Sequence, residues 1–379
     1  MSILSHVRIA FLSLALLLHL LGGEGLRRLL RGWRRRKPAV RTLAIAGGDR
    51  HMVADLYAVQ DARPRAGLLV THGVLDTGKD DPRLVALADE LASCGFAVLV
   101  PELEGLKSLR LEMAESEDIA AAFRFMLSRD EVDATRAGLL GISFAAGPTL
   151  KAAADPSIRD RVKFVVSFGG YYDTVNIIRY LTTGRDEYRS HRHVEPPEIY
   201  ARYVFVKNLL VHVTVAEDRR VLAGLLDDMQ READAGVTRW DGEAPVISPE
   251  RLTEDGRAVY DLIRNQDPAR VRSLVEATEP GVRHYLEGLS LRPVVPQVTA
   301  RVLIGHGDTD PLIPSTESLR LADALPDPSR VYVAVLKVVS HVDARLSVQS
   351  IREFLTATLP SCCRFYGLIF RILKQQLDL

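Results

Sequence analysis

The chain has 379 residues, 47% of them hydrophobic and 26% charged, which is typical of a folded protein and excludes wholesale disorder, collagen and a small disulfide scaffold. Its 49 basic and 49 acidic side chains balance, so the net charge gives no indication of a nucleic-acid partner. The balance hides an asymmetry, because residues 1–41 carry nine basic groups against the single acid Glu24, and the remainder carries 40 basic and 48 acidic groups.

The first segment predicts a contact with a membrane. Residues 9–21 are apolar apart from Ser13 and His19, and seven basic residues follow at 27–37. These 13 residues fall short of the roughly 20 that a spanning helix needs. Three alternatives are therefore open: an uncleaved anchor, a cleaved signal peptide, or a helix docked on the protein itself. With an anchor, the positive charges would keep the body in the cytoplasm; with a cleaved signal, it would be secreted or periplasmic.

From residue 41, short runs rich in Val, Leu and Ile alternate with helix-forming stretches. Such runs predict the buried strands of a mostly parallel sheet with helices on both of its faces. The first two runs, joined by a Gly-rich turn, predict an antiparallel hairpin at the sheet edge. The expected strands are 42–46, 53–59, 67–71, 96–100, 137–142, 164–168, 302–305 and 331–338, with helices at 82–93, 116–127 and 144–154.

The loop after the third expected strand comes within one residue of a phosphate-binding P-loop. Gly73 and the pair Gly78-Lys79 have the required spacing, but Asp80 stands where a P-loop needs the Ser or Thr that binds Mg²⁺. A nucleoside triphosphate is therefore disfavoured. No G-x-G-x-x-G motif follows an expected strand, so a dinucleotide is not indicated and no cofactor is expected.

Residues 139–147 predict an apolar strand, a sharp turn and a helix. A serine at such an elbow presents its hydroxyl at the carboxyl edge of the sheet, where open α/β sheets bind their ligands. The turn requires small residues two positions before and after Ser143, and Gly141 and Ala145 provide them. The alternative is a plain strand-to-helix turn with a helix-capping serine.

Residues 171–298 break the alternation and predict a helical cap over one end of the sheet. Helices are expected near 180 and at 199–211, 221–233, 249–264 and 268–277. Tyr171 and Tyr172, just past the sixth strand, either line the substrate pocket or pack the cap onto the core. His191, His193 and Glu195 have no ligand pattern elsewhere to complete a metal site, so they predict a solvated cap loop and no metal.

Two later loops bring further chemistry-bearing residues to the ends of strands. Asp308 and Asp310 follow the strand at 302–305, and His341 follows the strand at 331–338. A serine hydroxyl is a poor nucleophile near neutral pH, so it needs an imidazole to remove its proton and an acid to orient that imidazole. Because parallel strands end at the same edge, Ser143, His341 and one of the two aspartates are expected to converge.

Residues 41 to about 360 resemble the α/β-hydrolase superfamily. Asp310-Pro-Leu-Ile-Pro314 is similar to the D-x-x-[VI]-P sequence with which many serine esterases and peptidases of that superfamily carry the triad acid. The resemblance therefore implies Asp310, and not Asp308, as the acid. Ser143 at the elbow disfavours the aspartate nucleophile of the dehalogenases and epoxide hydrolases. Ala145, and Val339-Ser340 where a glycine often precedes the histidine, depart from the common pattern.

The same resemblance implies an oxyanion hole. The His72-Gly73 step after an early core strand is frequent in the superfamily, and it implies that the backbone N–H groups of Val74 and Phe144 stabilise the oxyanion. His72 and Gly73 are then expected beside the substrate. Loss of one such donor typically costs about 3 to 4 kcal/mol of transition-state stabilisation.

The C-terminal residues predict an amphipathic helix, because Phe365, Leu368, Ile369 and Ile372 share one face. The helix either packs on the core or makes a second membrane contact. The three cysteines, Cys94, Cys362 and Cys363, are too few and too badly spaced for a disulfide framework or a zinc site.

These patterns combine into one expected organisation. The fold is α/β, an α/β-hydrolase fold with a mostly parallel eight-stranded sheet, helices on both faces and an inserted helical cap. The segments are a membrane-anchor and basic segment at 1–40, the first part of the core at 41–170, the cap at 171–298, the second part of the core at 299–360, and the C-terminal helix at 361–379.

The expected function is hydrolysis of a carboxylic ester or thioester through an acyl-enzyme on Ser143, with Asp310 and His341 completing the triad. The substrate is a small-molecule or lipid-like ester, and the N-terminal segment meets a membrane surface; no cofactor, metal or nucleic acid is expected. The alternatives are a serine peptidase or acyltransferase of the same fold, and a catalytically inactive, membrane-tethered binding module.

Overall fold

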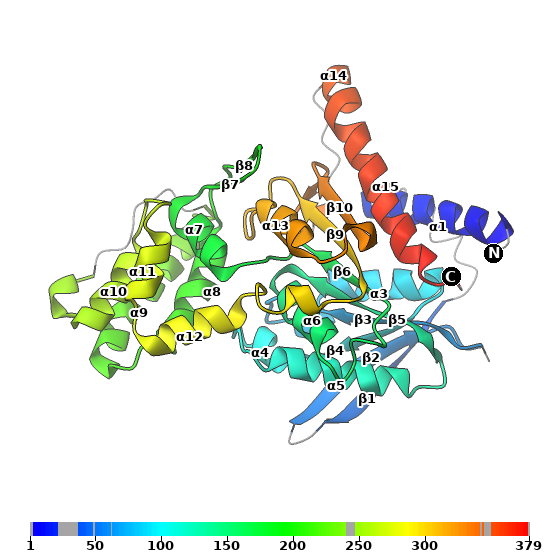
Figure 1. Ribbon diagram of the computed structural model, residues 1–379, viewed down its shortest axis with the longest axis horizontal. Helices are drawn as coiled ribbons and strands as arrows, with labels where there is room; N and C mark the ends of the chain where they lie inside the picture. The colour runs from blue at the N-terminus through cyan, green and yellow to red at the C-terminus, as the bar shows by residue number, and fades with distance from the viewer. Residues whose placement is uncertain are drawn as a thin grey trace.

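The structure is a computed structural model that describes residues 3–21, 37–47, 50–61, 63–239, 247–341, 343–344 and 350–377. The basic residues at 27–36, which the sequence analysis assigned to the membrane segment, lie outside these ranges. The described chain forms a central sheet with helices on its two faces and a second group of helices to one side (Figure 1).

Eight strands form one sheet in the order β1-β2-β4-β3-β5-β6-β9-β10. The pairs β1–β2 and β2–β4 are antiparallel, and the remaining neighbours are parallel. The expected mostly parallel eight-stranded sheet with a hairpin at its edge is confirmed. The bounds are β1 Ala39–Gly47, β2 Arg50–Ala58, β3 Arg65–Thr71, β4 Ala97–Pro101, β5 Val132–Ile142, β6 Phe164–Phe168, β9 Arg301–Gly307 and β10 Val331–Leu336.

The central strands are apolar on both faces because helices cover both faces. Leu68 and Leu69 are neighbours on β3 and point to opposite sides, yet each is fully buried. Leu69 belongs to the core with α5 (Glu115–Leu127), α6 (Ala146–Ala154) and α13 (Thr316–Ala324). Leu68 belongs to the core with α1 (Ile3–Leu21), α3 (Pro82–Cys94) and α15 (Leu359–Lys374).

Between β6 and β9 the chain forms a group of helices with a hydrophobic core of its own, on one side of the sheet (Figure 1). We refer to this group as the cap helices. They are α7 Thr174–Thr183, α8 Ile199–Leu210, α9 Ala216–Asp234, α10 Glu254–Ile263, α11 Val271–Ala277 and α12 Pro280–Leu289, with a short turn η3 at Pro249–Arg251. The helix α12 and a hairpin of β7 (Asp186–Tyr188) and β8 (His191–His193) had not been predicted from the sequence.

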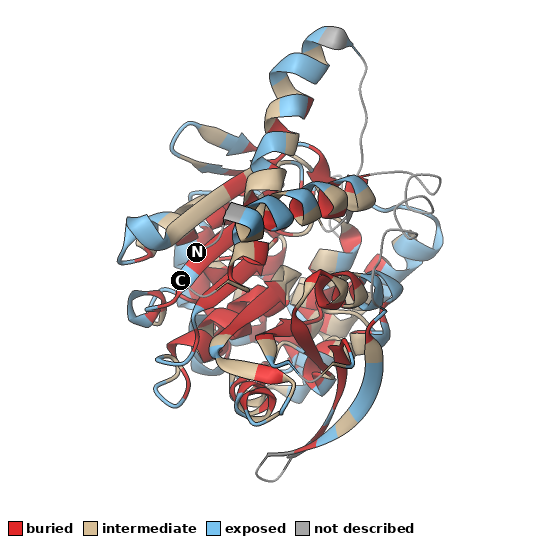
Figure 2. Ribbon diagram, turned by 90° about the vertical axis from the view of Figure 1, so that its right-hand side faces the viewer, coloured by how far each residue is buried: buried red, intermediate tan, exposed pale blue. Residues whose placement is uncertain are grey.

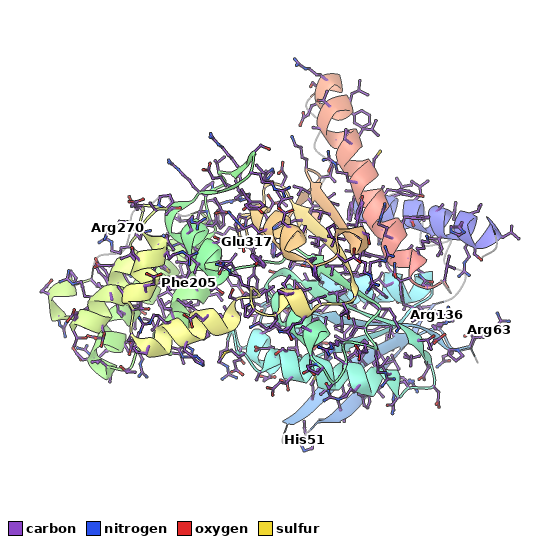
Figure 3. All side chains as sticks on the ribbon, in the orientation of Figure 1. His51, Arg63, Arg136, Phe205, Arg270 and Glu317 are labelled. Carbon is purple, nitrogen blue, oxygen red and sulfur yellow. The ribbon has the colours of Figure 1, made fainter. Side chains whose placement is uncertain are left out.

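A buried carboxylate fixes the point where the chain leaves β6 for the cap helices. Glu317 on α13 accepts hydrogen bonds from the backbone N–H groups of Tyr172 (2.9 Å) and Asp173 (2.7 Å), and from the Asn176 amide (2.8 Å). Arg320 donates to the same carboxylate at 2.8 Å. Figure 3 shows Glu317 between the sheet and the cap helices, with Phe205 on the cap side.

The N-terminal helix α1 lies against α15 on the body of the protein (Figure 1). The Tyr366 hydroxyl donates to the Ala10 carbonyl at 3.3 Å, and His19 Nε2 lies 3.2 Å from a carboxylate oxygen of Glu90 on α3. In this structure the helix lies docked on the protein, while its length and apolar composition also fit a membrane anchor or a signal sequence. The apolar face of α15 packs on β9 and β10 as well as on α1. The C-terminal helix therefore packs on the core, which was one of its two expected positions.

The opposite face of α1 is also apolar. Its outer stripe consists of Leu4, Val7, Phe11, Leu14 and Leu18, all exposed and spaced by three and four residues so that they share one face. Figure 2 shows the exposed side of this helix in pale blue. Among the described helices, only the one containing Leu4–Leu21 is long and apolar enough to cross a membrane, a property that signal sequences and buried core helices share.

The remaining described elements are short and connect the larger ones. They are α4 Glu104–Lys107, α14 Ile351–Glu353, η1 Gly78–Asp80, η2 Ser143–Ala145, η4 Val295–Gln297, η5 Pro328–Arg330, the π-helical turn η6 Phe354–Thr358, and a small hairpin of β11 (Val339–Ser340) and β12 (Asp343–Ala344).

Candidate active site

Ser143 stands at a sharp turn between β5 and α6. Its φ of 58° is in the left-handed region, which a residue with a side chain adopts only when the surrounding structure enforces it. A Cβ at Gly141 would lie 2.5 Å from Ala146 Cα, so only glycine fits there. Ala145 is fully buried, and its methyl group is accommodated in this turn. The strand-turn-helix geometry thus has the strained form of a nucleophile elbow.

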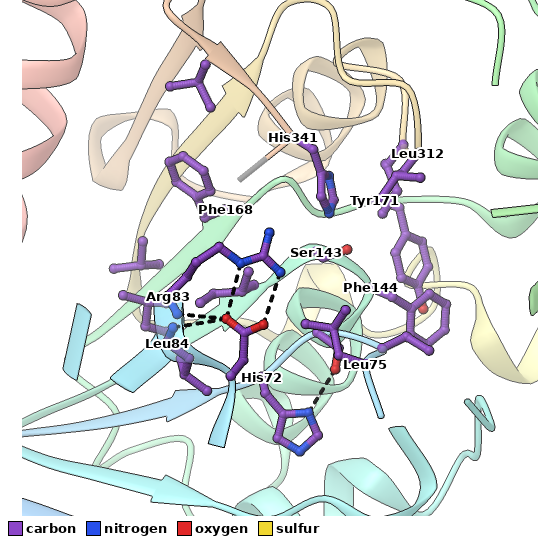
Figure 4. A pocket seen from close by; sticks show the side chains of 18 of the residues that line it. His72, Leu75, Arg83, Leu84, Ser143, Phe144, Phe168, Tyr171, Leu312 and His341 are labelled. Carbon is purple, nitrogen blue, oxygen red and sulfur yellow. Dashed lines mark hydrogen bonds and ion pairs between the residues drawn. The ribbon is translucent and has the colours of Figure 1, made fainter. Parts of the chain in front are cut away.

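His341 comes from a second tight loop at the same end of the sheet. It follows β11 and has a φ of 48°. Gly307 at the end of β9 makes room for this loop, because a Cβ there would lie 2.6 Å from the Val339 carbonyl oxygen and 3.1 Å from the His341 nitrogen. The imidazole points toward Ser143 (Figure 4).

Asp310 is fully buried behind His341. Its Oδ2 accepts a hydrogen bond of 2.8 Å from His341 Nδ1, and its Oδ1 accepts from the backbone N–H groups of Leu312 (2.8 Å) and Ile313 (3.0 Å). A carboxylate accepting at Nδ1 places the His341 proton on that nitrogen, which leaves Nε2 free to accept a proton.

The electrostatics of this pair are set by burial and by mutual attraction. Burial alone would raise the pKa of Asp310, but the neighbouring His341 and His306 hold it well below its ordinary value. Burial would lower the pKa of His341, but the Asp310 carboxylate raises it above its ordinary value of 6.5. Asp310 therefore stays ionised, and its carboxylate stabilises the protonated form of His341.

His306 supports the acid, and the sequence analysis did not assign it a role. Its Nε2 donates to the Ile313 carbonyl at 2.9 Å and lies 3.3 Å from Asp310 Oδ2, and its Nδ1 is 2.6 Å from the Ser318 hydroxyl. The ring is fully buried. Its position in β9 is the only signal in the sequence, because its contacts come from the following loop and α13.

Asp308, the other candidate acid, is engaged elsewhere. Its carboxylate lies 3.2 Å from His191 Nε2 in the β7–β8 hairpin, and its backbone N–H donates to the Leu336 carbonyl. The two aspartates of the loop thus have different partners. The structure brings Asp310, and not Asp308, into contact with His341.

The loop after β3 lies next to Ser143. A Cβ at Gly73 would be 3.4 Å from Ser143 Cβ, so the His72-Gly73-Val74 backbone lies against the serine. His72, expected beside the substrate, is among the residues that line the cavity at Ser143, but it is only 1% exposed and both of its ring nitrogens are bonded within the protein. Its Nε2 accepts from the Leu103 N–H at 3.0 Å, which leaves Nδ1–H to donate to the Gly73 carbonyl at 2.8 Å. His72 therefore holds the loop in position.

Ser143 and His341 lie on the wall of a cavity of about 830 Å³. Figure 4 shows Phe168 and Leu84 on one side of Ser143, and Phe144, Tyr171 and Leu312 on the other. Tyr171 lines the cavity; its ring stacks on Phe144 at 5.0 Å and its hydroxyl donates to the Leu289 carbonyl at 2.9 Å.

Tyr172 does not line the cavity, which was one of the two positions that the sequence analysis left open for it. Its ring packs against the core formed with α5, α6 and α13, outside the cavity lining. The reason is the anchoring of its backbone: the N–H donates to Glu317, and the carbonyl accepts from the Leu291 N–H at 3.0 Å.

No protein-family model matches the sequence, and no curated protein matches it. Among solved structures, an α/β hydrolase, GrgF from Penicillium sp. sh18, aligns over 90% of this chain and 100% of its own, with a TM-score of 0.50 and 16% identity. The chain has the α/β-hydrolase fold.

The acylaminoacyl peptidase of Pyrococcus horikoshii has the same fold over a part of its length. It aligns over 92% of this chain with a TM-score of 0.50 and 14% identity. This chain covers only 44% of the peptidase, so it spans less than half the length of that protein. In the α/β-hydrolase fold described here, the elbow serine, the acid loop after β9 and the histidine loop after β10 all lie at one edge of the sheet.

The P-loop-like segment of this α/β-hydrolase fold does not present its lysine to a ligand. Lys79 Nζ lies 2.8 Å from Asp55 and 2.8 Å from Asp80, and it is therefore held between two carboxylates. These carboxylates would repel a phosphate. The arrangement opposes the nucleotide interpretation of this loop.

The histidines of the β7–β8 hairpin were expected in a solvated loop, and this is wrong for His193. It is 2% exposed and packs edge-on against Tyr180 with ring centroids 5.0 Å apart, because the hairpin folds back onto α7 and α13. Within the described ranges, no group of three or more His, Cys, Asp or Glu side chains could hold a metal ion.

Proposed function

We propose that this protein hydrolyses a carboxylic ester or thioester through a covalent acyl-enzyme on Ser143. The observation that carries the proposal is the 2.8 Å hydrogen bond between His341 and the buried Asp310, on an imidazole that points toward a serine at a strained elbow. The solved structures of similar fold include proteins described as hydrolases and a peptidase, which supports a hydrolytic reaction class.

In the proposed mechanism, the Ser143 oxygen bonds to the substrate carbonyl carbon while His341 Nε2 takes the hydroxyl proton. The tetrahedral intermediate expels the alcohol or thiol, which receives that proton from His341. A water molecule then attacks the acyl-enzyme, again losing its proton to His341, and Ser143 leaves with that proton as the acid is released. Asp310 stays ionised throughout and stabilises the imidazolium.

The backbone N–H groups of Val74 and Phe144 are the proposed oxyanion donors. Gly73 lies against Ser143, so the next peptide unit is close to the serine, and Phe144 follows the serine directly. Donors fixed in the backbone need no reorganisation as charge develops on the carbonyl oxygen. The bonds from His72 to Gly73 and Leu103 keep the Val74 loop in place.

A fluorophosphonate probe tests the proposal, because it phosphonylates a serine only where a base and an oxyanion hole activate it. We expect one adduct per chain by intact mass, located on Ser143 by peptide mapping. Absence of labelling in protein with a cooperative thermal transition would contradict the proposal and favour the inactive binding module. With labelling established, release of free acid from an ester in water indicates a hydrolase, and acyl transfer to an added alcohol alone indicates an acyltransferase.

We also propose that the outer stripe of α1 inserts into a lipid surface. A helix that is apolar all round is normally buried, and α1 has one apolar face on the protein and a second one exposed. The basic residues that follow it in the sequence at 27–37 would attract anionic headgroups, each contributing about 1 kcal/mol. The stripe supports a helix that lies along the surface and does not span it.

Cosedimentation of the full chain with phosphatidylglycerol vesicles measures this association. The double variant Phe11→Glu, Leu14→Glu is expected to weaken binding by about tenfold or more, since each exposed apolar side chain contributes about 1.5 to 3 kcal/mol when buried. Val237→Glu, at an exposed apolar position beyond the end of α9, is the matched control and should bind as wild type. Equal binding of the double variant and wild type to the vesicles would contradict the proposal. It would also be contradicted if the wild type and the control were dimers in solution and the double variant a monomer, because the stripe would then be a contact between two copies of the chain.

A further inference from the structure

The cavity at Ser143 continues away from the cap helices into the layer between the sheet and the two terminal helices. We call this part the helix lobe. Its walls come from α1, α3 and α15, and its lining includes Leu16, Leu20, Leu87, Leu91, Leu368 and Ile372. Its floor is formed by the sheet, through Leu140 on β5 and Val166 on β6. The part on the other side of Ser143, the cap lobe, is lined by residues such as Ile177, Val204 and Phe205.

The helix lobe exists because three helices share one face of the sheet. α3 packs on β2 and β4, and α15 packs on β9 and β10, so the two helices stand on opposite sides of the central strands β5 and β6. α1 lies against α15 and reaches α3 through the 3.2 Å contact of His19 with Glu90. α1 therefore closes the space above β5 and β6, and the inner residues Leu16 and Leu20 form part of its wall.

The chemistry of the helix lobe selects its occupant. Leucine, isoleucine, valine and phenylalanine side chains supply most of the lining. The polar and charged residues at its border contact one another: Glu90 with His19, and Asp81 with Arg83 at 3.1 Å. An apolar cavity of this kind does not hold ordered water well. The cavity as a whole, about 830 Å³, is within the range of ligand sites, about 300 to 1,000 Å³.

We infer that the helix lobe binds a long, unbranched hydrocarbon chain of the substrate, so that the protein acts on long-chain esters. The inference rests on the proposed function, because it assumes that the scissile carbonyl lies at Ser143, where the two lobes meet. A hydrocarbon chain is apolar like the lining of the lobe, and the end of the chain that carries the ester group would lie at Ser143. The outer stripe of α1 lies on the far side of the same helix, so the roof of the lobe is also the part of the protein proposed to meet lipid.

Chain-length dependence is the first consequence. Each methylene that the lobe takes from water is expected to raise kcat/KM by about 3- to 4-fold until the lobe is full. Hydrolysis of p-nitrophenyl butyrate, octanoate and palmitate in detergent-dispersed form measures this dependence. The wild-type protein should prefer the palmitate to the butyrate by about tenfold or more. A preference for the butyrate would overturn the inference.

A pair of variants on α3 tests the location. Leu87 is half-buried and lines the lobe, whereas Val85, two positions earlier, is exposed on the same helix. Leu87→Trp fills the lobe and is expected to lower kcat/KM for the palmitate about tenfold more than for the butyrate, because the short acyl chain reaches less of the lobe. Val85→Trp should leave both values within about twofold of wild type. An equal loss on both esters in Leu87→Trp, or no loss on either, would overturn the inference.

Two further substrates show whether the acyl side or the alcohol side of the ester occupies the helix lobe. p-Nitrophenyl palmitate carries its long chain on the acyl side, and hexadecyl acetate carries a chain of the same length on the alcohol side. If Leu87→Trp impairs only one of them, that side of the ester occupies the lobe. Either result supports the inference. The inference is contradicted if wild-type protein hydrolyses hexadecyl and ethyl acetate at equal rates and also shows no preference for the palmitate over the butyrate.

Binding without turnover separates this inference from the proposed function. A fluorescently labelled palmitate should bind to Ser143→Ala protein, and Leu87→Trp in that background should weaken the binding about tenfold, whereas Val85→Trp should not. If fluorophosphonate labelling fails but the labelled palmitate binds in this pattern, the result supports chain binding in the helix lobe and contradicts the proposed hydrolase function. If labelling and butyrate hydrolysis succeed but palmitate does not bind, the lobe inference alone falls.

Discussion

Replacement of Ser143 with alanine is expected to lower kcat on an ester substrate by about 10⁵- to 10⁶-fold and to abolish fluorophosphonate labelling. The reason is that the acyl-enzyme cannot form without the serine oxygen, and only binding and oxyanion stabilisation remain. The fold should be unaffected, because alanine is smaller than serine and the φ of 58° is imposed by the elbow. Steady-state hydrolysis of p-nitrophenyl esters measures the loss.

Ser116→Ala is the matched control for this experiment. Ser116 lies on α5 with an exposed hydroxyl that donates to the Met113 carbonyl at 3.1 Å, on the face of the sheet away from the helix lobe. It should retain wild-type activity and labelling. Activity of Ser143→Ala within about tenfold of wild type would show that another group is the nucleophile, since removal of a catalytic serine leaves far less than this.

Replacement of Asp310 with asparagine is expected to lower kcat by about 10⁴-fold, whereas Asp308→Asn should remain within a small factor of wild type. The Asp310 carboxylate accepts from His341 Nδ1 at 2.8 Å, and an amide can also present its NH₂ group there, which favours the wrong tautomer of the imidazole. Asp308 lies 3.2 Å from His191 and has no comparable role. Comparable losses in both variants would contradict the assignment.

The pH dependence provides a second measure of the same pair. His341 must be neutral to accept the serine proton, and its pKa is raised above 6.5 because the attraction of Asp310 outweighs the effect of burial. In wild-type protein, kcat/KM should therefore fall as the pH drops through that raised pKa, about tenfold per pH unit below it. Asp310→Asn removes the attraction that raises this pKa, so the acidic limb of the residual activity should move to lower pH. An unshifted limb would show that Asp310 does not control this titration.

Much of the candidate site could be predicted because its parts depend on local sequence and on the direction of the strands. Gly141 and Ala145 around Ser143 predict a sharp turn, and the turn is present with a strained φ. Asp310 and His341 each follow an apolar run. In a parallel sheet the carboxyl ends of the strands lie at one edge, which is why residues 31 positions apart in the sequence form a hydrogen bond.

Other features could not be predicted because they depend on which surfaces meet. Tyr171 and Tyr172 are equivalent in the sequence, and the anchoring of their backbone by Glu317, 145 residues away from Tyr172, turns only Tyr171 into the cavity. The sequence also does not show that His72, which lies in the cavity lining, has both ring nitrogens bonded to the backbone of Leu103 and Gly73. His306 becomes a support for Asp310 only through the fold of the loop between them.

The sequence by itself determined the mostly parallel sheet, the elbow serine and the order of the acid and histidine loops, since periodicity, turn residues and strand polarity are local properties. It also showed that the N-terminal segment is apolar and followed by positive charge. Only the tertiary structure decided that α1 packs on α15, and that the space beneath it is continuous with Ser143. The physical reason is that apolar contact has no directionality: a helix that is apolar all round fits a membrane or a protein surface equally well, and the shapes of the facing surfaces decide between them.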